Sequence, residues 1–273
     1  MPDLYLVATP IGNLSELTPR ALEILKKVDL IACEDTRNSL KLLSHFGISQ
    51  RLFAYHDFNE EKASGEILAF LAEGKDVALI SDAGYPLISD PGYRLVNKAV
   101  DAGFRVIPVS GANACLDGLI ASGLPPAHFL FYGFLNANPS KARKELESLR
   151  SFPYTVVFYE APHRIHKTLN LLYEVFGNRK VCIARELTKL HEEFIRGELQ
   201  DLQSLGELKG EIVLIVEGQT HQEKIDPFSV LDEVEESLKT GMRTKEAVSV
   251  IAKKYGLSKN ELYDLYLKNR REE

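Results

Sequence analysis

Charged side chains stand at the ends of three apolar runs of this chain, at the point where each run stops. Carboxylates and a histidine in such places can take up a proton, whereas arginine and lysine can hold phosphate groups. The residues concerned are Glu34, Asp35, Arg37, Glu160, His163, Arg164, Arg185, Glu186 and Lys189. Their repeated placement favours the walls of one shared cleft, with unrelated surface ion pairs or helix caps as the alternative.

Residues 77–92 combine a buried strand with a polar loop. The first four residues are apolar without polar alternation, which is typical of a strand buried on both faces. Small and turn-forming residues follow, and Ser89 and Asp90 offer an N-cap ahead of Pro91, which suits the first position of a helix. A long polar loop at the carboxyl end of such a strand is where open α/β sheets bind ligands. The alternative is an ordinary connecting loop.

Short apolar runs alternate with helical patterns through residue 123. The strand-like runs lie at 4–8, 30–33, 77–80 and 106–109. This alternation predicts a largely parallel sheet covered by helices on both faces. The sequence Gly-Leu-Pro-Pro at 123–126 breaks the pattern and predicts a domain boundary.

A second set of elements follows this boundary. Strand-like runs lie at 129–135, 155–159, 181–184 and 212–216, and helical patterns lie at 140–151 and 163–176. We therefore expect an α/β protein in which domains 1–122 and 123–220 together form the cleft. A polar linker at 219–226 and a helical module at 226–273 complete the predicted organisation.

The C-terminal module is helical and basic. Gly241 ends one helical pattern, Ser258 and Glu261 form a capping box, and the arrangement resembles a helix-turn-helix. Residues 242–271 hold eight lysine and arginine residues against three acidic ones, within a chain whose net charge is -6. This asymmetry favours a nucleic-acid contact, and a packing or dimerisation module is the alternative.

The composition is that of an ordinary soluble globular protein, with 45% hydrophobic and 26% charged residues. No apolar run approaches the roughly 20 residues that cross a bilayer, and the chain does not open on a signal-peptide pattern. We therefore expect a cytoplasmic protein with no membrane contact. The three cysteines favour buried thiols, and the histidines have no ligand spacing beyond His163 and His166, so no metal site is expected. The acidic net charge argues against indiscriminate nucleic-acid coating.

Six blocks of the sequence together support a family resemblance. They are VATPIGNLSELTPRA at 7–21, CEDTR at 33–37, SDAGYPLISDPG at 81–92, YEAPHR at 159–164, ARELTK at 184–189 and GEIVLIVEG at 210–218. In order, and across nearly the whole chain, they resemble the ribosomal RNA methyltransferases of the tetrapyrrole methylase superfamily. The resemblance implies a two-domain α/β enzyme, usually a homodimer, that binds S-adenosylmethionine between its domains. It also implies methylation of the ribose 2'-oxygen of a cytidine in the decoding region of small-subunit ribosomal RNA, as free RNA or in the 30S particle.

The resemblance also assigns the cofactor to loops of small residues. Such loops let backbone N–H groups approach the methionine carboxylate and the nucleoside, and Asp82 can offset the sulfonium charge. The implied cofactor residues are Thr9, Ser81, Asp82, Ala83, Gly84, Leu87, Ile88, Ser110, Ala112 and Asn113. The implied RNA-binding residues are Arg37, Arg164, Arg185 and Lys189 in the cleft, with Lys253, Lys254 and Lys259 in the module.

A ribose hydroxyl reacts only when its proton has a destination, so a base is sought among the cleft residues. We rank Glu160 first, because it ends an apolar run and precedes Pro162, which can start a helix and fix the carboxylate toward the cleft. Glu186 and His163 are the next candidates, since histidine has an ordinary pKa near neutrality. An equal alternative is that Glu160 only caps the helix or orients Arg164. A purely positional mechanism also stays open.

Two other functions compete with ribose methylation. Superfamily members that methylate tetrapyrroles carry an acidic residue where this chain has Asn13, and an amide cannot serve as a carboxylate base. A small-molecule methyltransferase is therefore the second interpretation. The third is a helix-turn-helix regulator with an effector-binding domain, which leaves the charged ends of the apolar runs unexplained.

Overall fold

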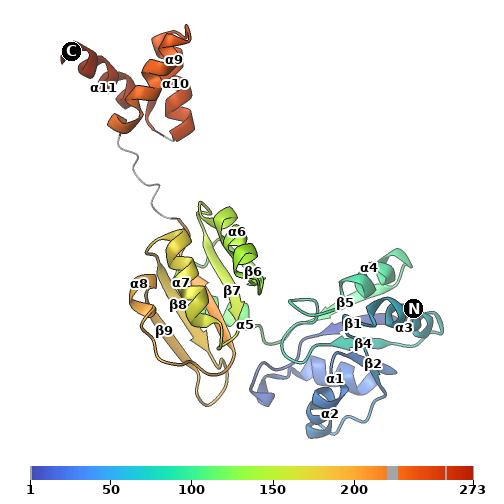
Figure 1. Cartoon of the computed structure of the whole chain (residues 1–273). Helices are drawn as coiled ribbons and strands as arrows, with labels where there is room; N and C mark the ends of the chain where they lie inside the picture. The colour runs from blue at the N-terminus through green and yellow to red at the C-terminus, as the bar shows by residue number, and fades with distance from the viewer. Residues whose placement is uncertain (1, 220–226, 256, 273) are drawn as a thin grey trace. The chain divides into compact units, whose positions relative to one another are not determined.

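The computed structural model describes residues 2–219, 227–255 and 257–272, with the side chains of the last two residues left out. The chain divides into two compact units, Met1–Gly218 and Gln219–Glu273 (Figure 1). No helix of the described residues is long and apolar enough to cross a membrane.

The first half of the larger unit is a five-stranded parallel sheet in the order β3-β2-β4-β1-β5. Its strands are β1 (Asp3–Val7), β2 (Leu30–Cys33), β3 (Leu52–Ala54), β4 (Val77–Ile80) and β5 (Arg105–Val109). Its helices are α1 (Pro19–Lys27), α2 (Thr36–His45), α3 (Glu60–Ala72) and α4 (Tyr93–Asp101). A short 3-10 helix, η1 (Leu14–Glu16), precedes α1.

Helices cover both faces of this sheet, as the sequence predicts. One core cluster joins Leu25 of α1 and Leu43 of α2 to Ile80 of β4. The other joins Ile67 of α3 and Leu95 of α4 to the opposite face of the same strand. All four residues of β4 are buried, which explains their unbroken apolar run.

The second half of the unit is a mixed sheet in the order β6-β7-β10-β8-β9. Its strands are β6 (Phe129–Phe134), β7 (Thr155–Glu160), β8 (Lys180–Arg185), β9 (Glu193–Glu198) and β10 (Ile212–Val216). Helices α6 (Pro139–Leu149), α7 (Ile165–Phe176) and α8 (Leu199–Leu202) pack on one face. The opposite face packs against α5 (Ala114–Ala121) and the loop that follows β1.

Two helix starts differ from the sequence prediction. Helix α4 begins at Tyr93, and its N-cap is Gly92, whose φ of 140° only glycine adopts readily; neither Ser89 nor Asp90 caps it. Helix α7 begins at Ile165, three residues after Pro162, with no side-chain cap. Both helices begin later than predicted: Gly92 separates Pro91 from α4, and a turn that contains Pro162 precedes α7.

The smaller unit is built from η2 (Pro227–Val230), α9 (Leu231–Lys239), α10 (Thr244–Tyr255) and α11 (Lys259–Glu272). It has its own core, in which Val234, Val248 and Leu262 are fully buried. Glu261 donates its backbone N–H to Ser258 Oγ at 3.4 Å, in keeping with the predicted cap. The predicted linker lies outside the described residues except for Gln219, and so does Gly256 between the last two helices.

Gly218 closes the larger unit and offers a clean test of its packing. A Cβ at this position would lie 2.4 Å from the Tyr154 carbonyl oxygen, so the backbone would have to move. We expect Gly218→Ala to lower the free energy of unfolding by about 1–3 kcal/mol in urea titrations of the full chain. The control is Gly206→Ala, where a Cβ meets no atom within 4 Å. Equal stability of the two variants would contradict this packing.

Candidate active site

The central strands β1 and β4 create a crevice at their carboxyl ends. They are hydrogen-bonded neighbours, yet the chain leaves β1 for α1 on one face of the sheet and leaves β4 for α4 on the other face. The two connections therefore diverge above the sheet. Such a topological switch point is where open α/β sheets bind ligands.

The loops that leave these strands are tied together by hydrogen bonds. Thr9 N–H donates to the Gly84 carbonyl at 2.8 Å, and Gly84 N–H donates back to the Thr9 carbonyl at 3.0 Å. Ser81 Oγ donates to the same Gly84 carbonyl at 2.9 Å, and Thr9 Oγ1 donates to the Ser81 carbonyl at 3.1 Å. Gly84 has a φ of 77°, so another residue there would be strained.

The crevice forms a pocket that both sheets line, which we call the switch-point pocket. Its cavity volume is about 180 Å³, and the pocket is open to solvent on one side. From the first half come Ile11, Ala83, Gly84, Tyr85, Ile88, Ser89, Asp90, Asn113 and Ala114; from the second come Tyr159, Leu187, Glu211, Ile212 and Val213. The pocket is mainly apolar, with carboxylates as its only formally charged side chains.

The predicted cofactor residues fall into two groups. Ala83, Gly84, Ile88 and Asn113 line the pocket. The other six surround or support it: Thr9, Ser81, Asp82, Leu87, Ser110 and Ala112. Asp82 is exposed and accepts a hydrogen bond from Asn38 Nδ2 at 2.9 Å. The sequence missed the aromatic residues Tyr85 and Tyr159 and the carboxylates Asp90 and Glu211.

The predicted placement of Glu160 toward the cleft is wrong. Successive side chains of β7 alternate between faces: Tyr159 lines the pocket, whereas Glu160 lies on the helix-covered face with Thr168 of α7. Glu160 is 3% exposed, accepts hydrogen bonds from Thr168 and the Ala161 N–H, and lies 3.3 Å from Arg164 Nε. These contacts match the alternative in which Glu160 positions Arg164.

The other predicted proton acceptors are also poorly placed. Glu186 accepts hydrogen bonds from Lys189 Nζ at 2.8 Å and from the Glu211 N–H at 3.1 Å, and the Lys189 contact lowers its pKa. His163 is exposed and is absent from the pocket lining. Asp35 caps α2 and pairs with Arg37 at 2.8 Å, so the interpretation as a capped helix start describes these two residues.

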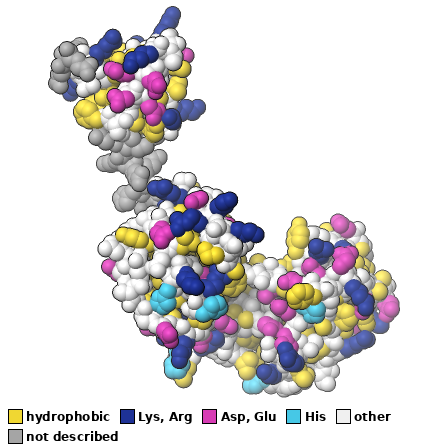
Figure 2. Space-filling view, in the orientation of Figure 1, with side chains coloured by type: hydrophobic (Ala, Val, Ile, Leu, Met, Phe, Trp, Pro, Cys, Tyr) yellow, Lys and Arg dark blue, Asp and Glu magenta, His cyan; other side chains and the backbone are white. Residues whose placement is uncertain are grey.

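The predicted phosphate-binding side chains do not form one cluster. Arg185 donates to Glu193 at 2.6 Å, and Arg164 donates to the Leu135 carbonyl at 2.9 Å. In the smaller unit Lys254 pairs with Glu233 at 2.6 Å, whereas Lys253 and Lys259 are exposed. On the face shown in Figure 2, basic side chains of this unit are interspersed with acidic ones.

Asp90 is the pocket residue with the most unusual electrostatics. Burial, followed by the negative charges of Glu34, Asp82 and Asp57, raises its pKa to about 7. Burial and Asp82 also raise the pKa of Glu34. Carboxylates outside the pocket lining therefore repel the negative charge of Asp90 within it, an arrangement that favours a cationic ligand over an anionic one.

Comparison with known proteins identifies this architecture. A family model described as Tetrapyrrole (Corrin/Porphyrin) Methylases matches residues 3–203. The chain belongs to the tetrapyrrole methylase family. A second model, the RsmI C-terminal HTH domain, matches residues 230–270.

Relatives within the tetrapyrrole methylase family span nearly the whole chain. Proteins named Ribosomal RNA small subunit methyltransferase I are 46% identical in Halalkalibacterium halodurans and 43% in Bacillus subtilis, each covering 96% of this chain and 94% and 93% of their own length. The Escherichia coli O157:H7 protein of that name is 44% identical, over 95% of this chain and 93% of its own. The predicted resemblance is thereby confirmed.

A solved structure shows the same fold. The uroporphyrin-III-C-methyltransferase from Thermus thermophilus superposes with a TM-score of 0.57 at 20% identity, covering 81% of this chain and 96% of its own. At that identity the likeness concerns the fold alone.

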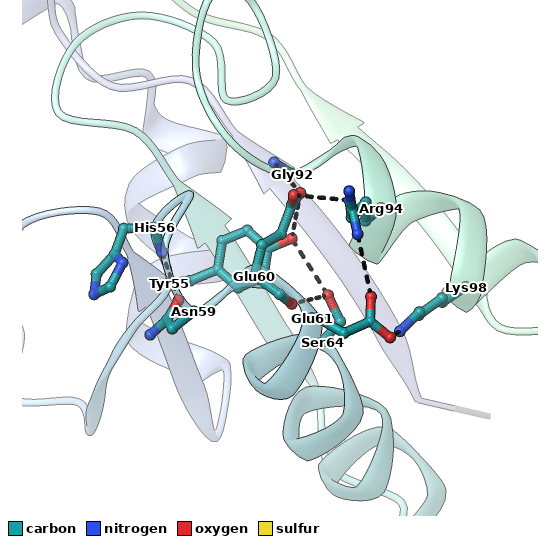
Figure 3. Close-up of polar contacts among 9 residues, drawn as sticks. All are labelled: Tyr55, His56, Asn59, Glu60, Glu61, Ser64, Gly92, Arg94 and Lys98. Atoms are coloured by element: carbon teal, nitrogen blue, oxygen red, sulfur yellow. Dashed lines mark hydrogen bonds and ion pairs between the residues drawn. The ribbon is translucent and has the colours of Figure 1, made fainter.

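The end of the loop 81–92 of this tetrapyrrole methylase is held at Gly92 by a partly buried polar network (Figure 3). Glu60 of α3 accepts hydrogen bonds from the Tyr55 hydroxyl at 2.9 Å and from the Gly92 N–H at 3.3 Å. Arg94 Nε lies 3.4 Å from the second Glu60 oxygen. Tyr55 is 1% exposed, so its hydroxyl depends on these protein partners.

Removing the Glu60 carboxylate should release this loop. Glu60→Ala leaves the buried Tyr55 hydroxyl and the Gly92 N–H without that acceptor, at a cost of about 1–3 kcal/mol for a buried group. We expect amide hydrogen exchange in residues 85–92 to quicken roughly tenfold or more while the β4 amides stay protected. The matched control is Glu66→Ala on the same helix, which removes only a 3.7 Å surface pair with Lys62. The same exchange in both variants would show that Glu60 does not hold the loop.

Proposed function

We propose that this chain is an S-adenosylmethionine-dependent methyltransferase of small-subunit ribosomal RNA. We further propose, as the sequence resemblance implies, that it methylates the ribose 2'-oxygen of a cytidine in the decoding region. The observation that carries the proposal is the similarity, over nearly the whole chain and at 43–46% identity, to proteins named as methyltransferases of small-subunit ribosomal RNA. The switch-point pocket supplies independent support for the cofactor.

The chemical types of the residues that line the pocket suit S-adenosylmethionine. Ile11, Ile88 and Leu187 offer apolar surface for a nucleoside, and Ala83 with Gly84 leaves the backbone accessible to the methionine group. The carboxylates favour a sulfonium cation, whereas the phosphates of a nucleotide cofactor would meet charges of their own sign. S-adenosylmethionine supplies an electrophilic methyl group on a carbon bonded to positively charged sulfur.

The protein contributes geometry to this reaction. Holding the acceptor oxygen in line with the methyl carbon can supply ~7–11 kcal/mol of the barrier reduction. The pocket opens between two sheets of one compact unit, so side chains from both can fix the two reactants. A low-dielectric apolar lining also strengthens the electrostatic interactions within it.

RNA binding, self-association and location complete the proposal. The basic module supplies phosphate contacts through Lys253 and Lys259, both exposed. Homodimerisation and a cytoplasmic location remain predictions. The exposed apolar side chains Leu116 and Ile120 on α5, 45% and 72% exposed, are candidates for a surface between copies.

The competing functions receive less support. Asn13 caps η1, accepting the Ser15 N–H at 3.1 Å, and is absent from the pocket lining. Its side chain therefore has a structural role where tetrapyrrole-methylating members carry an acidic residue. A helix-turn-helix regulator with an effector-binding domain would also contain a ligand pocket, but the relatives are named for ribosomal RNA methylation. A gel shift with duplex DNA against ribosomal RNA separates that function from RNA methylation.

The decisive experiment is a methylation assay with mapping. Isolated small subunits and naked small-subunit ribosomal RNA, both from cells lacking this protein, are incubated with labelled S-adenosylmethionine. We expect label in at least one substrate, on one ribose of the decoding region, protected from alkaline cleavage as 2'-O-methylation requires. Label on a base, or in neither substrate, would refute the proposed reaction.

Charge reversal in the module tests its contact with RNA. We expect the double substitution Lys253→Glu and Lys259→Glu in the full chain to weaken RNA binding and to make log K less steep against log salt. Each lost phosphate contact removes roughly 0.7–0.9 of a unit from that slope. Lys62→Glu, a single charge reversal in the larger unit, is the control and should preserve the slope. Unchanged affinity and slope in the double variant would make the module a packing element.

A further inference from the structure

The loop that carries Asp90 has unusual backbone geometry. Within the described chain, the non-glycine residues with positive φ are Leu87 at 72°, Ser89 at 64°, Glu186 at 50° and Thr188 at 67°. Each lies next to, or is itself, a residue that lines the switch-point pocket. Left-handed backbone is costly for such residues, and it concentrates where a structure must aim particular groups.

Asp90 makes no contact among the described residues that would indicate a structural role. The expected cap of α4 is supplied by Gly92, and Glu60 accepts the Gly92 N–H. Among the described residues, no side chain or backbone group donates a hydrogen bond to Asp90 or forms an ion pair with it. The carboxyl group is nevertheless held at the pocket, in a loop fixed by the Glu60 network and close enough to β6 that a Cβ on Gly133 would lie 3.3 Å from Ser89 Oγ.

The charged groups around Asp90 all raise its pKa. Glu34, from the β2–α2 connection, Asp57, from the β3–α3 connection, and Asp82 disfavour a second negative charge there. Across the pocket stand Tyr159, whose pKa burial raises to about 12, and Glu211. The Asp90 pKa of about 7 places its titration where a general base is most effective.

Three other carboxylates, one in the pocket lining and two predicted from the sequence as proton acceptors, are bound by basic side chains or face away from the pocket. Glu211 lies 3.1 Å from Lys189 Nζ and is 75% exposed, and Glu186 is bound to the same lysine. Glu160 faces the opposite side of its sheet. Of these four carboxylates, Asp90 and Glu211 line the pocket. Asp90 is the one of this pair that is half-buried and lacks a donor among the described residues.

We propose that Asp90 is the catalytic base that takes the proton of the acceptor hydroxyl. The ribose oxygen forms a bond to the methyl carbon, the carbon–sulfur bond breaks with its electron pair left on sulfur, and the hydroxyl proton passes to an Asp90 carboxylate oxygen. This inference rests on the proposed function, because it needs an acceptor hydroxyl in the switch-point pocket.

The test compares full-length wild type with Asp90→Asn, which keeps the shape of the side chain and removes its basicity. We expect single-turnover methylation of the small-subunit substrate to fall on the order of 10²- to 10⁴-fold. The affinity for S-adenosylhomocysteine, measured by calorimetry, should change by less than about threefold, because its neutral sulfur gains little from the carboxylate. The wild-type rate at low cofactor should rise with pH through about 7, and this step should vanish in the variant.

A stability measurement provides a readout separate from activity. A carboxyl whose pKa is raised in the folded state contributes stability below its unfolded pKa and loses that contribution as pH rises through the folded value. The melting temperature of Asp90→Asn minus that of wild type should therefore increase as the pH is raised from 5 to 8. The matched control, Asp57→Asn, removes a neighbouring charge from outside the pocket lining; it should keep the plateau rate and move the pH step downward.

Three outcomes would overturn the assignment of Asp90. A near-native rate with an intact pH step removes its role, and a loss of S-adenosylhomocysteine affinity as large as the loss of rate makes it a binding residue. If wild type binds no S-adenosylmethionine or leaves the RNA unmethylated, the proposed function itself fails. Wild-type methylation with an unaffected Asp90→Asn variant leaves the function standing and rejects Asp90 alone.

Discussion

The connections that follow two neighbouring strands leave on opposite faces of the sheet, and this determines where the site lies. β1 and β4 lie side by side at the centre of a parallel sheet, and right-handed crossovers carry their connections to opposite faces. No helix can then cover their shared carboxyl edge, so the loops after them meet over open space. The Thr9–Gly84 bridge closes the floor of that space, and the second sheet supplies its far side. The cofactor assignment and the placement of Asp90 both depend on this arrangement.

The two-residue period of a strand explains why a correct strand prediction placed Glu160 on the wrong face of the sheet. The sequence places β7 correctly and ends it at Glu160, but a buried strand has two apolar faces. Val157 packs toward the first half of the chain and Phe158 toward α7, and both are fully buried. Composition cannot tell the two faces apart. Only the packing partners reveal that Tyr159, one residue earlier, faces the pocket.

Most of the fold was predictable because its central strands are unbroken apolar runs. β3 was missed because it has three residues, and β9 because its charged sequence EFIRGE is that of a sheet edge. Part of the site was predictable too, since Ala83, Gly84 and Ile88 lie in the one loop of small and turn-forming residues that follows β4. Asp90 was misassigned because an aspartate before proline has the same local pattern whether it caps a helix or serves a pocket; the distinction rests on Glu60, which lies 30 residues away in the sequence.

The gathering of carboxylates at the pocket has a consequence for turnover. Glu34, Asp82 and Asp90 repel one another in the free protein, and the sulfonium of the proposed cofactor would relieve that repulsion. Methyl transfer converts the sulfonium to a neutral thioether, so the attraction that held the incoming cofactor disappears as soon as the reaction is complete. Under the proposed function, we therefore expect the demethylated product to be the weaker ligand of the same site. The repulsion that costs the empty pocket stability thus favours exchange of product for fresh substrate.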